Sequence, residues 1–308
     1  SPKYGRLVTN EKKTTRFLAG IRGAAGDWDW ETAALYSKAT ADDVTNNRIS
    51  NTLLSEALSD PTAAAFNIFS VDATNIERAL VDVYRKDKSE LTLVDFKASN
   101  NEIVSMPAGP VGLLVGLEYR KESYSDNRDP RLDGTIKYVA DNGSEFPFVS
   151  DVLGSSPTTD SVGEKNTTSV FAELQIPVTD TIDAQLAFRH EDISDAGTTS
   201  VGKLAVGWNA TDWLLVRGSA QTATRAPNLV QVNQAQVARF GSRVDAVYQY
   251  ITENNTTTAS GMDSDSKYTI QRFATGADKL ESEKSKNSSI GLVIQPPQIE
   301  GLTVTYDA

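Results

Sequence analysis

The segment 167–225 consists of four consecutive runs in which apolar residues alternate with polar or small ones. Alternation with a period of two residues is the pattern of a β-strand whose two faces differ. In the second run the apolar positions are Ile182, Ala184, Leu186 and Phe188, and polar or small residues stand between them. Because short turns join most of the runs, the segment predicts an antiparallel meander with one apolar and one polar face.

The runs are long for a soluble protein. Each covers about 10–13 residues, whereas strands of soluble domains cluster near about 5–6 residues. A tilted strand that crosses a membrane needs about 9–11 residues. The length therefore favours a membrane β-barrel. A soluble β-sandwich is the alternative fold, because its core could also use one apolar face of such a sheet.

Tryptophans stand next to the tight turns. Trp208 and Trp213 bracket a turn at 209–213, and Trp28 and Trp30 directly follow a turn at 25–27. In membrane barrels, aromatic side chains gather where the strands leave the hydrocarbon region. The four tryptophans are therefore predicted membrane-interface residues.

The connections between strands alternate in length along the whole chain. About ten strands are expected, and long connections cover about 40–87, 125–166 and 226–284. Tight periplasmic turns at one end and long extracellular loops at the other are typical of a transmembrane up-and-down barrel. Short helices are expected in the first long loop, at 48–59 and after a capping box that begins at Thr74.

The chain of 308 residues has a formal net charge of −11, no cysteine and a single histidine. Its acidic balance argues against nucleic acid as a partner, because phosphate binding needs a basic surface. Without cysteine there is no thiolate nucleophile and no cysteine metal site. His190 lies near Ser194 and Ser200 in the sequence, but neither is expected to share its strand face at a suitable spacing. The sequence therefore predicts no enzyme, no cofactor and no metal site.

Charged side chains occupy the polar positions of the runs; examples are Glu118, Arg120, Asp183, Arg189, Lys203 and Arg217. An Arg or Lys that faced lipid near the membrane centre would cost about 2–4 kcal/mol. Several such costs would exceed the total stability of a typical domain, about 5–15 kcal/mol. The polar face is therefore expected to meet water or protein.

Three strings of the sequence resemble a known family. MPAGPVGLLVGLEYR (106–120) resembles a hairpin from the middle of a barrel, and WLLVRGSAQTATRAPNL (213–229) resembles a strand that ends in an Arg-Ala-Pro string before a large loop. LESEKSKNSSIGLVIQPPQIEGLTVTY (280–306) is similar to a strand that begins Leu-Pro-Glu-Ser, with serine here at the usual proline position, and to the hairpin after it. In this order and spacing the strings resemble the TonB-dependent receptors of the Gram-negative outer membrane.

This resemblance implies a 22-stranded barrel in the outer-membrane lipid, occluded by an N-terminal plug domain. Such receptors take up scarce nutrients, namely iron chelates, cobalamin or oligosaccharides, with energy supplied by the TonB complex. Both chain ends are interpreted as cuts, so residues 1–308 are expected to be one partial barrel domain, with the plug and both barrel ends absent. A passive porin or an adhesin-like barrel without energy coupling is the alternative function.

Arg225 and Asn228 are the favoured candidate ligand-binding residues, because they lie at the mouth of the third long loop. The other candidates are arginines of the polar face: Arg120, Arg189 and Arg217. The arginines could meet an anionic chelate or a sugar acid. The alternative role for them is structural: ion pairs across strands with Glu118, Glu122, Asp183 and Glu191, or contacts with a plug.

Overall fold

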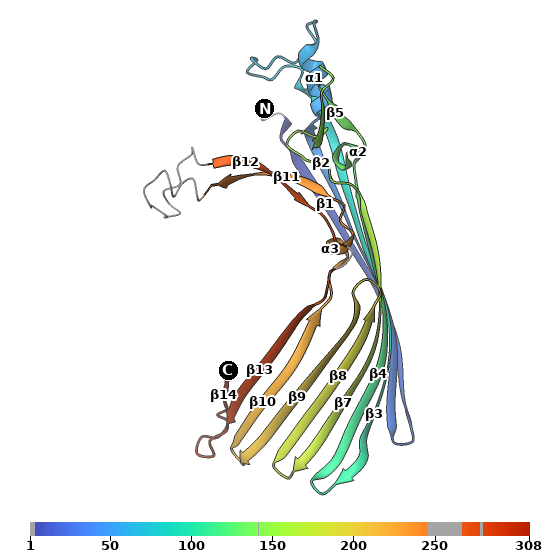
Figure 1. Cartoon of the computed structure of the whole chain (residues 1–308), viewed down its shortest axis with the longest axis vertical. Helices are drawn as coiled ribbons and strands as arrows, with labels where there is room; N and C mark the ends of the chain where they lie inside the picture. Colours follow the sequence, from blue (N-terminus) through green and yellow to red (C-terminus); the bar gives the residue numbers. More distant parts are fainter. Residues whose placement is uncertain (1–3, 141, 246–266, 278–279) are drawn as a thin grey trace.

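A computed structural model describes residues 4–140, 142–245, 267–277 and 280–308. Ten strands form one antiparallel sheet in chain order, and two separate two-stranded hairpins lie in the long connections (Figure 1). The strands of the large sheet are β1 (Leu7–Ala25), β2 (Trp28–Ile49), β3 (Leu80–Met106), β4 (Gly109–Arg128), β7 (Ser161–Thr179), β8 (Ile182–Ile193), β9 (Gly197–Thr211), β10 (Leu214–Arg225), β13 (Glu283–Ile294) and β14 (Val304–Asp307). The predicted all-β meander of about ten strands is confirmed.

The pairing register gives the sheet two unlike faces. One row across the strands joins Asp95, Glu118, Ser169 and Glu191, and the neighbouring row joins Phe96, Leu117, Val170 and His190. Residues in one row share a face, because side chains of paired residues point the same way. We call the face with Glu118 the charged face and the face with Leu117 the apolar face.

Among the residues that the structure describes, none covers the apolar face. Leu117 is 54% exposed, Phe188 50% and Ile290 61%. A contiguous apolar surface of this extent is unusual on a soluble monomer and marks a surface that meets lipid or protein. Trp28, Trp30 and Trp208 lie on this face toward the short turns, and Trp213 lies in the turn between β9 and β10.

The sheet has a turn end and a loop end. Short connections at 26–27, 107–108, 180–181 and 212–213 lie at the turn end, the lower end in Figure 1. The loop end carries the three long connections, which are 50–79, 129–160 and 226–282. The first two are shorter than predicted because β2, β3, β4 and β7 continue beyond the expected strand limits. In these extensions, polar residues pair through backbone hydrogen bonds without the apolar alternation on which the prediction relied.

The helices only partly follow the prediction. α1 (Asn51–Ser59) lies within the expected range, and the Ser50 hydroxyl accepts a hydrogen bond from the Leu53 amide at 3.2 Å. The capping box at Thr74 is wrong: Asn75 has φ of +68° and gives no side-chain cap to the short 3₁₀ helix η2 (Ile76–Ala79). Leu80 then starts β3, because pairing with β2 outweighs the local helical pattern.

Short helices occur in all three long connections rather than in the first alone. The second connection contains α2 (Pro130–Asp133) and the hairpin of β5 (Lys137–Val139) and β6 (Glu145–Ser150). The third contains α3 (Leu229–Asn233) and the hairpin of β11 (Val237–Val244) and β12 (Lys267–Ala274). No helix in the described part of the chain is both long and apolar enough to cross a membrane.

The first two long connections form a small core at the loop end. Ser50 pairs with Val152 in an isolated β-bridge, and both residues are fully buried. Asp151, also fully buried, accepts hydrogen bonds from the Ser50 hydroxyl at 2.7 Å and the Thr52 amide at 3.0 Å, and it forms an ion pair with Arg131. Burial alone would raise the pKa of Asp151, but these hydrogen bonds outweigh it and hold the pKa below its ordinary value.

Candidate functional site

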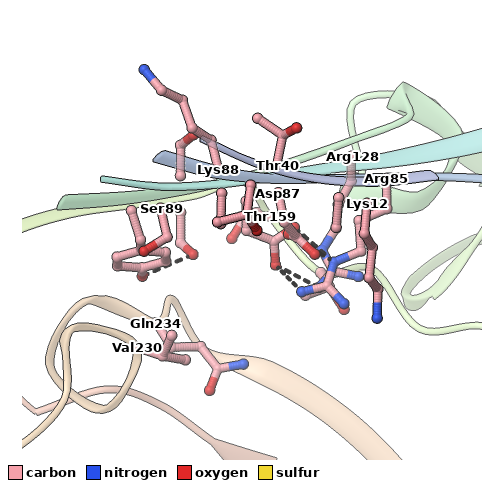
Figure 2. A pocket seen from close by; sticks show the side chains of 18 residues that line it. Lys12, Thr40, Arg85, Asp87, Lys88, Ser89, Arg128, Thr159, Val230 and Gln234 are labelled. Carbon is pink, nitrogen blue, oxygen red and sulfur yellow. Dashed lines mark hydrogen bonds and ion pairs between the residues drawn. The ribbon is translucent and has the colours of Figure 1, made fainter. Parts of the chain in front are cut away.

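A cavity of about 420 Å³ lies at the loop end, between the charged face of β1–β4 and α3. Figure 2 shows its wall edge-on, with Arg85, Asp87 and Arg128 pointing from the sheet toward the loop that carries Val230 and Gln234. Lys88 and Thr40 project from the opposite face of the same strands. The cavity volume falls within the range of about 300–1,000 Å³ that is typical of small-molecule sites.

The wall of the cavity holds a compact ionic cluster. Arg85 lies directly opposite Arg128 in the register of β3 and β4, and Asp87 lies opposite Asp126. The Arg85 guanidinium donates to both carboxylate oxygens of Asp126, at 3.0 and 2.9 Å, and its Nε lies 3.2 Å from Asp87 Oδ1. Arg128 Nη2 donates to the same Asp126 carboxylate at 2.7 Å. Two guanidinium groups therefore share one carboxylate.

Lys12 gives this cavity an excess of positive charge. It lies on the charged face of β1, opposite Ala41, and makes no ion pair within the described residues. Three cationic groups, Lys12, Arg85 and Arg128, thus face the two carboxylates of Asp87 and Asp126. The excess is that of the lining residues; Asp43, opposite Arg85 on β2, belongs to the same charged face but does not line the cavity. At the cavity itself the excess favours an anionic ligand.

The remaining lining supplies hydroxyl groups and one apolar surface. Tyr124 donates to Ser161 at 3.0 Å, and Thr158 and Thr159 also line the cavity. Val230 and Gln234 form its opposite side. Such a lining can bind a ligand through ion pairs, hydrogen bonds and apolar contact. The described residues contain no group of three or more His, Asp or Glu side chains placed to hold a metal ion.

Arg120 and Arg189 lie on the charged face outside this cavity. Arg189 pairs with Glu118 at 2.9 Å and Glu191 at 2.7 Å, and Arg120 lies 3.5 Å from Glu122. Arg189–Glu118 is a cross-strand ion pair of the kind that the sequence offered as the structural alternative, whereas Glu191 and Glu122 lie on the same strands as the arginines they contact. Their role in ligand binding stays a prediction.

The other three candidate residues are also absent from the cavity lining. Arg217 pairs with Asp307, and Arg225 Nη1 lies 3.6 Å from Glu283. The Asn228 side chain accepts from the Gln231 amide at 2.8 Å, while the Gln231 side chain accepts from the Asn228 amide at 2.9 Å. This reciprocal capping box begins α3, so Asn228 has a structural role that accounts for it.

His190 has a partner that the sequence reading excluded. Its Nδ1 lies 2.8 Å from the Ser200 hydroxyl, because the two residues are directly opposite in the register of β8 and β9. The prediction that Ser200 does not share its face was therefore wrong. Within the described residues no carboxylate hydrogen-bonds the imidazole, so the pair lacks the third group of a catalytic triad.

The sequence reading missed the cavity residues because it assigned them to loops. Arg85 and Asp87 fell in the expected loop 40–87, and Asp126 and Arg128 in the expected loop 125–166. Charges at every second position, as in Arg85 and Asp87 or Asp126 and Arg128, were the available signal of a strand with one charged face.

Comparison with known proteins agrees with this architecture. A model of the family described as TonB dependent receptor-like, beta-barrel, matches residues 1–306. Comparison with curated proteins gives no match.

Among solved structures, the siderophore receptor PirA from Acinetobacter baumannii is similar, with a TM-score of 0.59 and 18% identity over 94% of this chain and 33% of that one. A ferric enterobactin receptor (PfeA) mutant from Pseudomonas aeruginosa gives a TM-score of 0.55 and 17% identity, over 97% of this chain and 34% of the receptor chain. The RagAB peptide importer in its closed-closed state gives a TM-score of 0.53 and 11% identity, over 95% of this chain and 29% of the matched chain.

The chain spans about a third of the length of these matched structures. At such identities the structural similarity shows the fold, which is that of a section of barrel wall. The family match covers nearly every residue, and it agrees with the long antiparallel strands, the uncovered apolar face and the long connections at one end. The chain belongs to the TonB-dependent receptor-like β-barrel family.

Proposed function

We propose that this chain is part of the wall of an outer-membrane receptor that imports a scarce nutrient with energy from the TonB complex. The cavity with the charge excess of Lys12, Arg85 and Arg128 is the observation that carries the proposal. It lies at the loop end, where a ligand arriving from outside the cell would first meet the barrel. The apolar face would meet lipid, and the charged face would line the lumen or contact a plug domain.

The ligand class that suits the cavity is a small anionic compound. The three cationic groups favour negative charge, and the hydroxyl groups and Val230 offer hydrogen bonds and apolar contact. The solved relatives named above include receptors for a siderophore and for ferric enterobactin, and a peptide importer. We therefore propose an iron chelate or an acidic peptide as the ligand, with cobalamin and neutral oligosaccharides less suited.

Uptake by the full-length protein in its native outer membrane tests this function. Radiolabelled ferric enterobactin, ferric citrate, an acidic peptide, cobalamin and maltohexaose would be offered to cells with and without a proton uncoupler. The proposal expects saturable uptake of one of the anionic compounds, and the uncoupler should abolish it. Uptake that is unsaturable and insensitive to the uncoupler would instead establish the passive barrel.

A pair of lysine variants links the uptake to the cavity. Lys12→Gln removes one of the three positive charges that face the cavity, whereas Lys38→Gln removes a lysine on the opposite face of β2 that does not line the cavity. Losing one partly screened charge at a few ångströms weakens anion binding by about 1 kcal/mol, or about fivefold. The proposal expects this loss in Lys12→Gln alone, and equal affinities of the two variants would contradict it.

A further inference from the structure

The short helix α3 is docked on the charged face of β7 by a few contacts. Lys165 Nζ donates to the Pro227 carbonyl at 3.2 Å, just before the helix begins. At the other end of the helix, Asn233 covers Gly163: a Cβ atom added to Gly163 would lie 2.6 Å from Asn233 Nδ2. Leu229, which lies between Pro227 and Asn233 in the sequence, is buried. The helix therefore lies directly on the backbone of β7.

These contacts hold an element that has little stability of its own. α3 contains five residues, and isolated helices shorter than about 12–15 residues are marginal in water. Its capping box and two hydrogen bonds to the returning chain, from Gly276 and Ala277, make it a compact unit. None of these links the unit to the sheet. Its position on β7 therefore depends on Lys165, Gly163 and the burial of Leu229.

Lys165 contacts two partners, the Pro227 carbonyl and the Glu122 carboxylate. Its side chain is only 9% exposed, and its Nζ lies 3.2 Å from the Pro227 carbonyl and 3.7 Å from Glu122 Oε2. A buried ammonium group cannot be left without a partner, because the desolvation cost would be large. Glu122, which Lys165 already contacts with α3 docked and which also lies 3.5 Å from Arg120 Nε, remains as that partner if the Pro227 contact breaks. The charge of Lys165 thus stays compensated whether α3 is docked or released.

We propose that α3 is a movable floor of the cavity, and that Lys165 is the positioning residue that holds the floor in place. With α3 docked, Val230 and Gln234 close the cavity on one side. When Lys165 shifts from the Pro227 carbonyl to Glu122, α3 is released and the cavity opens toward the rest of the charged face. A role of this opening in the passage of a ligand rests on the proposed function. The equilibrium between docked and released α3 does not depend on that function.

Distance measurements on the full-length receptor, without ligand, test the docking equilibrium. Residues 1–308 contain no cysteine, so once any cysteine elsewhere in the full-length receptor is replaced by serine, spin labels can be placed at two introduced cysteines. The positions are Ala235→Cys, exposed just after α3, and Val162→Cys, exposed on the apolar face of β7. Pulsed electron resonance then gives the distribution of distances between the labels. The docked floor is expected to give one short distance, and a released floor adds a longer one.

Variants of Lys165 and of Glu122 should change the ratio of released to docked α3 in opposite directions. Lys165→Met removes the hydrogen bond to Pro227 and should raise the ratio of long to short distances about tenfold, a typical effect for a hydrogen bond to a charged group. Glu122→Gln weakens the competing partner and should lower that ratio. Lys165→Arg, which keeps a charged donor, should restore most of the docked population.

Lys121 provides the matched control. It lies on β4 opposite Asn166, projects from the apolar face, and pairs with Glu164 at 2.9 Å, so Lys121→Met removes a lysine ion pair next to Lys165 without touching α3. Its distance distribution should equal that of the wild type. Unchanged distributions in both Lys165→Met and Glu122→Gln would overturn the proposal. If Lys165→Met fails to fold, an unchanged ratio in Glu122→Gln is sufficient to overturn it.

The two proposals can fail separately. The spin-label experiment contains no ligand, so a moving α3 would stand even if none of the five uptake compounds were bound. Conversely, saturable uptake with a static α3 would keep the receptor function and remove the movable floor.

Discussion

Arg217 on β10 forms a bidentate ion pair with Asp307 on β14, although a whole strand lies between them. Arg217 Nε and Nη2 donate to the two Asp307 oxygens at 3.0 and 2.6 Å. The intervening residue in this row is Gly291, and a Cβ atom there would lie 2.0 Å from Asp307 Oδ1. The missing side chain of Gly291 is therefore what lets the ion pair form across β13.

Gly291→Ala is expected to break this ion pair. The methyl group would displace the Asp307 carboxylate, and Arg217 would turn toward Asp183, which lies in the same row on the other side of Gly207. Overpacking of this kind costs about 1–3 kcal/mol. The loss of stability can be measured by unfolding the full-length protein with heat, using its change of mobility on gels as the readout. Gly202→Ala is the control, because the nearest atom to its added Cβ lies 3.6 Å away; an equal loss in both variants would contradict the explanation.

Asp126→Asn is expected to strengthen the binding of an anionic ligand. The change removes the carboxylate that Arg85 and Arg128 share, so the two guanidinium groups would be freer to contact a ligand. We expect about a threefold to tenfold lower dissociation constant for the imported anion, and a steeper loss of affinity as salt is added. Titration calorimetry at two salt concentrations measures both. Weaker binding than in the wild type would show that Asp126 orients the arginines rather than neutralising them.

The junction between the first two long connections is expected to weaken in acid. The pKa of Asp151 is held below its ordinary value, so its contribution to stability is complete above the unfolded pKa, near 3.9, and is lost as the pH falls through the lower folded value. Asp151→Asn should remove this pH dependence, and it leaves Arg131 without its carboxylate at a cost of about 3–5 kcal/mol. Hydrogen exchange of the amides at 50–52 and 150–152 measures the effect. Asp72→Asn, an exposed carboxylate in the first connection, should behave as the wild type.

The apolar face should tolerate charge only near the loop end. Leu117→Arg places a guanidinium in the uncovered apolar belt and should reduce the stability of the full-length protein by about 2–4 kcal/mol. Ser123→Arg lies on the same face of the same strand but nearer the loop end, where the cost should be about 0–1 kcal/mol. Urea unfolding in lipid vesicles measures both, and equal costs would contradict burial of Leu117 in lipid.

The sheet could be predicted from the sequence wherever apolar alternation was clear. Within 167–225, β8, β9 and β10 lie within a few residues of the expected runs, and β7 extends beyond its run only at the loop end, where it starts at Ser161. The extension of β2 to Ile49 could not be foreseen, because polar residues in 40–49 give no alternation. There the backbone pairing with β3 determines the structure.

The candidate site depends on contacts that no local pattern reveals. The Arg85–Asp126 pair requires the register of two strand ends that were expected to be loops. The contact of Lys165 with Pro227 joins residues on β7 and in the third long connection. Arg217 forms an ion pair, as in the structural alternative for the arginines, but its partner Asp307 is not among the four carboxylates that the sequence offered; Gly291 leaves room for this pair.

The orientation of the sheet in the membrane is the claim on which the rest of the account depends, and spin-label accessibility along β4 tests it most directly. Single cysteines at 113–118 in the full-length receptor, reconstituted in lipid vesicles, would be labelled and their collision rates with oxygen and with a water-soluble nickel complex measured. The account predicts high oxygen access at Leu113, Val115 and Leu117, and low oxygen access at Leu114, Gly116 and Glu118. High access to the nickel complex at all six positions would contradict it.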